Sequence, residues 1–205
     1  MFLSFEGLDG CGKTTQAELL ARRLTDIGHT VLVLREPGGT KISEDIREIL
    51  LNKNNSSMFS TTEMLLFAAA RTQLVQEVIL PSLARHSIVI CDRYVDSTTA
   101  YQGFGRGISR DTICTINNIA TQKLYPAKTF FLDISVEESL RRRNRSRQTT
   151  DRMEEAETLF FQHISEGFHS IAQQEPHRFV IIDGMNSVEI VHQKIWNIVF
   201  QQFAQ

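Results

Sequence analysis

Short runs of apolar, β-branched and aromatic residues alternate along this chain with longer segments in which apolar residues recur every three or four positions. Runs of the first kind are typical of strands buried on both faces, and segments of the second kind are typical of amphipathic helices. The pattern predicts five strands, at residues 2–6, 30–34, 87–92, 129–134 and 179–183. Strands that alternate with helices indicate an α/β fold with a parallel sheet, and we expect helices to cover both faces of every strand.

Helices are predicted in the intervals, at residues 13–26, 42–52, 61–85, 109–123, 136–144, 153–173 and 187–203. Ser135 stands just before one of them and Ser187 begins another, and at such positions a hydroxyl can accept a hydrogen bond from a free backbone N–H. Ser135 and Glu138 together fit the pattern of a capping box. These signals place the starts of two helices.

The length of 205 residues suits one globular domain, and no repeat or linker divides the chain, so we expect a single domain over residues 1–205. Apolar residues make up 41% and charged residues 22%, which excludes disordered and low-complexity classes. A formal net charge of -2 gives no sign of a nucleic-acid or membrane partner. The longest apolar run, residues 64–70, is much shorter than the about 20 residues that span a bilayer.

The cysteines and the N-terminus bear on the cellular compartment. Three cysteines without a C-x-x-C pair argue against a disulfide framework and against a structural zinc site. The N-terminus lacks the basic and apolar regions of a signal peptide. We therefore expect a reducing, cytoplasmic location.

A glycine-rich segment follows the first predicted strand directly, and residues 7–14 fit the pattern G-x-x-x-x-G-K-[ST]. Glycines permit backbone conformations that turn N–H groups toward phosphate oxygens, and the helix that begins here adds the positive end of its dipole. Lys13, expected as a charge on a surface loop, would add a full positive charge, and the Thr14 hydroxyl suits Mg2+. The segment predicts a nucleoside triphosphate site made of Gly7, Leu8, Asp9, Gly10, Cys11, Gly12, Lys13, Thr14 and Thr15.

Two further charged features extend this prediction. Asp92 ends an apolar strand, and proteins with a phosphate-binding loop (P-loop) like residues 7–14 place a carboxylate near Mg2+ at such a position. The alternative is an aspartate that only forms a turn, and this is less favoured because Arg93 follows directly. Residues 141–152 hold six of the sixteen arginines. Such a run is often a solvated loop or a nucleic-acid patch, but this one has no interleaved aromatic residues. We therefore interpret it as a mobile lid that closes over phosphates.

Other classes of P-loop protein fit less well. GTPases read guanine with N-K-x-D, and the nearest match, residues 52–55, lacks the aspartate. Motor ATPases are normally larger or carry further domains. A compact phosphoryl-transfer enzyme with a small acceptor remains, and the alternatives are a different nucleoside monophosphate or deoxynucleoside kinase and a nucleotide-dependent switch.

Four segments, residues 5–16, 35–40, 66–71 and 92–103, resemble those of thymidylate kinases in family order. These enzymes phosphorylate dTMP to dTDP with ATP. The resemblance implies a P-loop NTPase fold with sheet order 2-3-1-4-5, ATP and dTMP as substrates with Mg2+, a lid at about residues 141–152, and a homodimer. It implies Thr14 and Asp92 as the residues that hold the metal.

The resemblance also implies roles for individual residues. Asp9 would lie near the sugar 3′-hydroxyl, Phe67 would stack on thymine, and Tyr101 would pack against the deoxyribose. Arg93 would hold the acceptor phosphate, and Arg71 the base or that phosphate. The complete implied dTMP site is Asp9, Glu36, Phe67, Arg71, Arg93, Thr98, Tyr101 and Gln102.

Gly10 occupies the position where one type of thymidylate kinase has a P-loop arginine. The chain therefore resembles the bacterial type, which places catalytic arginines in the lid. Arg145 and Arg147 are the candidates to contact the transferring phosphate, in addition to Lys13 and Arg93. Arg152 is implied to pack near the adenine of ATP.

Overall fold

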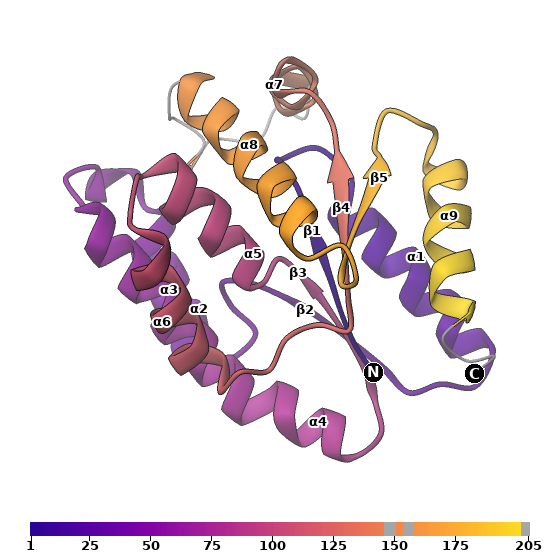
Figure 1. Ribbon diagram of the computed structural model, residues 1–205. Helices are drawn as coiled ribbons and strands as arrows, with labels where there is room; N and C mark the ends of the chain where they lie inside the picture. The colour runs from indigo at the N-terminus through magenta and orange to yellow at the C-terminus, as the bar shows by residue number, and fades with distance from the viewer. Residues whose placement is uncertain (146–150, 154–157, 202–205) are drawn as a thin grey trace.

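The computed structural model describes residues 1–145, 151–153 and 158–201, which form a central sheet flanked by helices (Figure 1). The strands in this part of the chain are β1 (Phe2–Glu6), β2 (Val31–Arg35), β3 (Ile88–Asp92), β4 (Lys128–Asp133) and β5 (Phe179–Asp183). Neighbouring strands all pair in parallel, in the order β2-β3-β1-β4-β5. The predicted fold class and strand order are therefore confirmed.

The helices are α1 (Lys13–Asp26), α2 (Lys41–Leu51), α3 (Ser60–Leu74), α4 (Leu80–Ala84), α5 (Val95–Thr98), α6 (Arg110–Thr121), α7 (Val136–Arg145), α8 (Thr158–Gln174) and α9 (Val188–Gln201). Helical segments η2 (Val75–Ile79) and η3 (Thr99–Gly105) continue α3 and α5, and a short 3-10 turn, η1 (Lys53–Asn55), follows α2. The π-helical η2 joins α3 to α4, which matches the long helix predicted at 61–85. The start of the helix predicted at 153–173 includes residues 154–157, which lie outside the described residues.

Each face of the sheet carries its own hydrophobic core (Figure 1). Helices α1 and α9 cover one face, where Phe5 packs with Leu20 and Trp196. The segments from α3 to α6 and helix α8 lie on the other face, where Phe131 stacks on Phe168 with ring centroids 5.0 Å apart. Apolar strands between two helical layers are the arrangement that the sequence pattern predicts.

The two edge strands are less buried than expected. Strands β1 and β3 are buried throughout, but Val33 in β2 is 38% exposed and Ile181 in β5 is 48% exposed. The expectation that both faces of all five strands are covered is therefore wrong at the edges. An edge strand has one neighbouring strand, and the helices that cover the middle of the sheet leave part of it open to solvent.

The helix starts agree in part with the predicted caps. The Ser135 hydroxyl accepts a hydrogen bond from the Glu138 backbone N–H at 3.1 Å, and Ser187 accepts one from the Ile190 N–H at 3.4 Å. The Glu138 carboxylate, however, accepts hydrogen bonds from Arg141 and Arg142. The reciprocal half of the predicted capping box is wrong, because two arginine side chains offer that carboxylate charge-assisted partners.

The carboxyl ends of the parallel strands lie at one edge of the sheet. The segments that follow β1, β2 and β3 therefore meet there, although they are far apart in the sequence. None of the helices described combines the length and the apolar character needed to cross a bilayer.

Candidate active site

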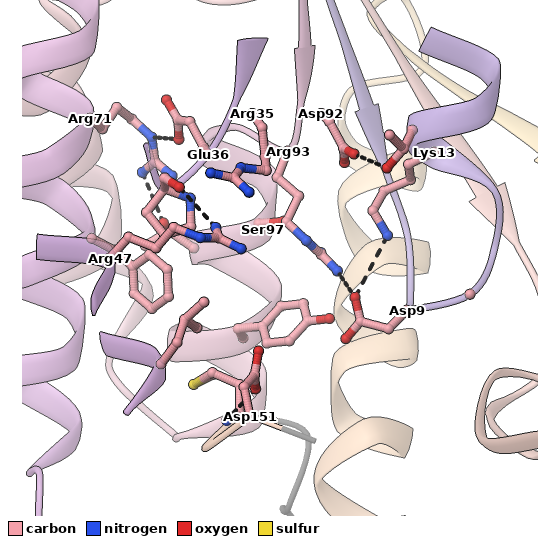
Figure 2. A pocket seen from close by; sticks show the side chains of 18 of the residues that line it. Asp9, Lys13, Arg35, Glu36, Arg47, Arg71, Asp92, Arg93, Ser97 and Asp151 are labelled. Atoms are coloured by element: carbon pink, nitrogen blue, oxygen red, sulfur yellow. Dashed lines mark hydrogen bonds and ion pairs between the residues drawn. The ribbon is translucent and has the colours of Figure 1, made fainter. Parts of the chain in front are cut away.

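A cleft of about 560 Å3 opens where the segments after β1, β2 and β3 meet, between α1, α2, α3 and η3 (Figure 2). Many of the residues predicted from the sequence line this cleft. They are Asp9, Gly10, Gly12, Lys13, Thr14, Thr15, Glu36, Phe67, Arg71, Asp92, Arg93, Thr98, Tyr101 and Gln102. A cleft of this size is typical of small-molecule sites.

The loop between β1 and α1 has the backbone that its glycines predict. Gly7 has a φ of 139°, and a Cβ atom there would lie 2.6 Å from the Leu132 carbonyl oxygen, so no larger residue fits. Leu8 and Cys11 are buried and turn away from the cleft. These two residues can therefore contact a phosphate only through their backbone.

Lys13 is buried rather than exposed, with 7% of its side chain accessible. Its Nζ donates hydrogen bonds to the Gly7 carbonyl at 3.1 Å and to the Leu8 carbonyl at 2.9 Å, and it lies 3.9 Å from Asp9 Oδ1. The expectation of a surface charge is wrong because the loop folds around the ammonium group. The charge is thereby held at the floor of the cleft.

Thr14 and Asp92 come together from α1 and β3. The Thr14 hydroxyl donates a hydrogen bond to Asp92 Oδ2 at 2.5 Å. Hydroxyl and carboxylate oxygens suit a hard divalent cation, which completes its coordination with water and substrate phosphates. No group of three or more His, Cys, Asp or Glu side chains gathers for a metal within the described residues. The hydroxyl and carboxylate of this pair could hold a divalent cation whose other ligands come from water and a bound nucleotide.

Arg93 joins the P-loop to the segment after β3. Its guanidinium forms an ion pair with Asp9 and donates hydrogen bonds to the Gly7 carbonyl and to Ser97 Oγ, both at 3.1 Å. Burial favours a raised pKa for Asp9, but Arg93 and then Lys13 outweigh it, so the pKa lies below its ordinary value. Arg93 also has a φ of 71°, a conformation that is rare outside glycine and is found at functional sites.

Glu6 binds the turn at residues 94–97, directly after Arg93, and was not predicted as a site residue. Its buried carboxylate accepts hydrogen bonds from the Tyr94 N–H at 2.7 Å, the Ser97 N–H at 3.2 Å and the Ser97 hydroxyl at 2.6 Å. Burial, and then the nearby Asp96 carboxylate, raise the pKa of Glu6 to about 7. Glu6 lies in segment 5–16, which carries the family resemblance, but nothing in the local pattern distinguishes it from the last residue of a strand.

Arg71 is fixed at the opposite end of the cleft from Lys13 (Figure 2). It donates to Glu36 at 2.7 Å, to Thr98 Oγ1 at 2.8 Å and to the Tyr94 carbonyl at 3.1 Å. Burial raises the pKa of Glu36, although Arg71 acts in the opposite direction. Phe67 is half-buried and also lines the cleft. It lies one helical turn before Arg71, so the two side chains share one face of α3, as predicted.

Tyr101 lies between these two ends, on η3. Its side chain is buried, and the guanidinium carbon of Arg93 lies 5.2 Å from its ring centroid. The helical segment from Val95 to Gly105 was not predicted, since it contains threonines and glycines, which have low helix propensity. Contacts with α8 hold it in place and bring Tyr101 and Gln102 to the cleft.

The predicted lid residues are only partly described. Arg145 ends α7, is exposed and does not line the cleft, and Arg147 lies outside the described residues. Arg152 is buried, with Nη2 2.7 Å from Glu63 Oε2 and Nε donating to the Leu50 carbonyl at 2.8 Å. Its guanidinium is thus engaged beside α2 and α3, and the adenine contact stays a prediction.

Several lining residues were missed by the sequence analysis. They are Arg35, Pro37, Arg47, Leu51, Ser97, Asp151 and Met153. Three of these, Arg35, Pro37 and Ser97, lie in the segments that carry the family resemblance, and that position was an available signal. Arg47 donates to the Pro37 carbonyl at 2.9 Å, and burial lowers its pKa, but nothing in the pattern of α2 distinguishes it from a solvent-facing arginine.

Comparison with known proteins finds relatives that match this chain along nearly its whole length. Residues 5–195 match the family model of thymidylate kinase. The thymidylate kinase of Geobacter sulfurreducens is 51% identical over 193 residues, which cover 92% of this chain and 91% of that protein. That of Geotalea uraniireducens is 45% identical over 100% of this chain and 98% of its own.

A solved structure agrees in fold as well as in sequence. The crystal structure of thymidylate kinase from Ehrlichia chaffeensis superposes with a TM-score of 0.79 and 36% identity, covering 97% of this chain and 98% of that one. The family match spans nearly the whole chain. This chain therefore belongs to the thymidylate kinase family and is a nucleoside monophosphate kinase.

Proposed function

We propose that this chain transfers the γ-phosphoryl group of ATP to dTMP, giving dTDP and ADP as a step toward dTTP. The observation that carries the proposal is one cleft with Lys13 at one end, Arg71 at the other and Arg93 between them (Figure 2). Phosphoryl transfer needs two substrates in line and positive charge around the transferring oxygens. This arrangement places the positive charge along a single cleft, in which the two substrates would lie end to end.

The donor nucleotide would occupy the P-loop end. Backbone N–H groups of the loop and Lys13 would hold its phosphates, and Thr14 and Asp92 would hold Mg2+. When bound, Mg2+ neutralises phosphate charge and helps to orient the γ-phosphate. The protein's own contribution is to fix the Lys13 ammonium and the loop backbone before substrate arrives, so that little rearrangement is needed during transfer.

The acceptor would occupy the end formed by α3 and η3. Phe67 would stack on the base, Arg71 and Gln102 would face its polar edge, and Tyr101 would pack against a sugar without a 2′-hydroxyl. Arg93, bound to Asp9, would hold the acceptor phosphate near the donor, where a planar guanidinium can make two hydrogen bonds. Glu36 and Thr98 support this end because they fix Arg71.

The proposal is tested by measuring ADP release with ATP, Mg2+ and a panel of nucleoside monophosphates. We expect dTMP to be the preferred acceptor. A different preferred monophosphate would assign the cleft to another kinase specificity. Nucleotide binding without acceptor-dependent ADP release would instead favour a switch or binding module.

Replacing Phe67 with alanine should raise the KM for dTMP by about 10-fold to 100-fold, because stacking of a base on an aromatic ring contributes about 1–3 kcal/mol. The KM for ATP should change much less. Phe59→Ala, in the same region but 81% exposed, provides the matched control. Equal increases in both KM values would show that Phe67 serves the core rather than the acceptor.

We propose that Arg145 and Arg147 act on the transferring phosphate from a lid at about residues 141–152. Arg145→Ala and Arg147→Ala are made separately, and the variant that removes the catalytic arginine should lower kcat by ~10^3, the low end of the effect of such an arginine. The dissociation constant of dTMP should change little. Steady-state kinetics and equilibrium binding of each variant separate the two effects. An unchanged kcat in both variants would place the role elsewhere.

We also propose a single cytoplasmic domain that forms a homodimer. Large apolar side chains are exposed on three helices that pack side by side, α2, α3 and α6. They include Ile49, 47% exposed, Leu65, 48% exposed, and Ile119, 67% exposed. A second copy of the chain would cover these side chains.

A further inference from the structure

Glu63 is a buried carboxylate for which the proposed mechanism has no role. It lies in the first turn of α3 and is 1% exposed. Gln102 Nε2 donates a hydrogen bond to its Oε1 at 2.9 Å, and Arg106 donates two hydrogen bonds to its two oxygens at 3.2 Å. Arg152 Nη2 lies 2.7 Å from Oε2. Partners from two segments of the chain, residues 102–106 and Arg152, thus converge on one side chain.

The charge of Glu63 follows from these partners. Burial favours a raised pKa for Glu63, but the hydrogen bonds from Arg106, Gln102 and Arg152 outweigh it, and the pKa lies below its ordinary value. The side chain is therefore an ionised carboxylate at neutral pH. An ionised carboxylate only accepts hydrogen bonds.

This charge determines which way the Gln102 amide faces. An amide has a donor end and an acceptor end, and an acceptor oxygen placed against a carboxylate would be repelled. The Gln102 nitrogen must therefore face Glu63, as observed. With Nε2 held at Glu63, the acceptor Oε1 is available to the cleft that Gln102 lines.

An acceptor at this position distinguishes pyrimidines by their hydrogen-bonding edges. Thymine presents an N3–H donor next to its O4 acceptor, whereas cytosine presents an N3 acceptor next to a 4-amino donor. Arg71 offers only donors, and Oε1 of Gln102 offers an acceptor. The pair matches the thymine edge and mismatches the cytosine edge at both positions.

We propose that Glu63 is a positioning residue for acceptor specificity: it orients the Gln102 amide so that the cleft selects a base with an N3–H donor. The inference rests on the proposed function, in which Gln102 faces the base. Glu63 itself lies behind Gln102 and need not touch the nucleotide.

The test is the ratio of the dissociation constants of dCMP and dTMP, measured by calorimetry for each variant. In Glu63→Gln the new amide can donate to Gln102 Oε1, so the Gln102 amide can turn over. The ratio should fall by about tenfold, the contribution of one hydrogen bond. Arg106→Gln removes ion pairs from Glu63 but keeps the Gln102 hydrogen bond, and it should leave the ratio unchanged.

The exchange variant Glu63→Gln/Gln102→Glu gives a rescue that a merely structural role does not predict. The amide at position 63 donates to the carboxylate at position 102, and this carboxylate still presents an acceptor to N3–H. We expect the ratio to return to within about threefold of the wild type, a margin below the effect of one hydrogen bond. Because the variant retains the same set of side-chain atoms, it also serves if the single variant fails to fold.

The outcomes separate the inference from the proposed function. A wild-type protein that binds dCMP as well as dTMP would contradict the proposed function. A wild-type preference that survives Glu63→Gln, falls equally in Arg106→Gln, or is absent from a folded exchange variant would overturn the role of Glu63 alone. Thermal unfolding of each variant establishes that it is folded.

Discussion

Lys13→Ala is expected to lower kcat for phosphoryl transfer by ~10^4, within the range found when one charge that stabilises the transition state is removed. The ammonium group is held at the floor of the cleft by the carbonyls of Gly7 and Leu8, and it faces the position proposed for the donor phosphates. An alanine cannot replace that charge. The loss should appear in single-turnover measurements of ADP formation from bound ATP and dTMP.

The burial of Lys13 means that fold stability must be measured in the same experiment. Alanine leaves two carbonyl groups without the donor they use now, which costs about 1–3 kcal/mol for each group that water cannot reach. Lys13→Met retains the apolar stem and is the better-packed second variant. Lys194→Ala, an exposed lysine on α9, is the control. Near-normal kcat in a folded Lys13→Met protein would contradict the P-loop assignment.

The P-loop could be predicted because its signal is local. All of its defining residues lie within 7–14, directly after a strand, so the motif and its structural context are visible together. The strands could be predicted for a similar reason, since burial on both faces requires continuous apolar runs. Strand β3 begins one residue later than predicted, and β2 is shifted by one residue. The reason is that hydrogen bonding between β2 and β3, which pairs Val31 with Ile88, sets where these strands begin and end, whereas the prediction used hydrophobicity.

Two of the buried acidic residues could not be predicted, because their partners are distant in the sequence. Glu6 binds the turn at residues 94–97, and Glu63 binds Gln102 and Arg106. A glutamate at the end of a strand or in the first turn of a helix looks like an ordinary surface residue. Only the three-dimensional contacts show that these two carboxylates fix the side chains that line the cleft.

Lys13 illustrates the same limit within a motif that was recognised. The sequence identifies the residue and its chemistry, but not the fact that the loop closes around its ammonium group. Burial depends on how the loop packs against the Leu132 carbonyl and α1, which no local pattern records. The sequence motif therefore predicts which groups act, and the structure adds how each of these groups is held.

Arg93→Ala is expected to lower kcat/KM for dTMP by ~10^4, since one guanidinium is proposed both to hold the acceptor phosphate and to stabilise the transferring charge. Arg93 is fixed by Asp9, the Gly7 carbonyl and Ser97 at the centre of the cleft. Its backbone φ of 71° lies in the left-handed region, a strained conformation of the kind that is concentrated at functional sites.

The comparison of lysine and alanine at position 93 tests the geometry as well as the charge. Arg93→Lys keeps a positive charge but cannot offer two parallel N–H groups, so it should recover only part of the lost kcat/KM. Arg85→Ala, which removes an exposed arginine before β3, should leave both kinetic constants unchanged. If Arg93→Lys restores full activity, charge alone matters at this position. If Arg93→Ala stays within about tenfold of the wild type, less than the smallest effect of a catalytic arginine, the acceptor phosphate is held elsewhere.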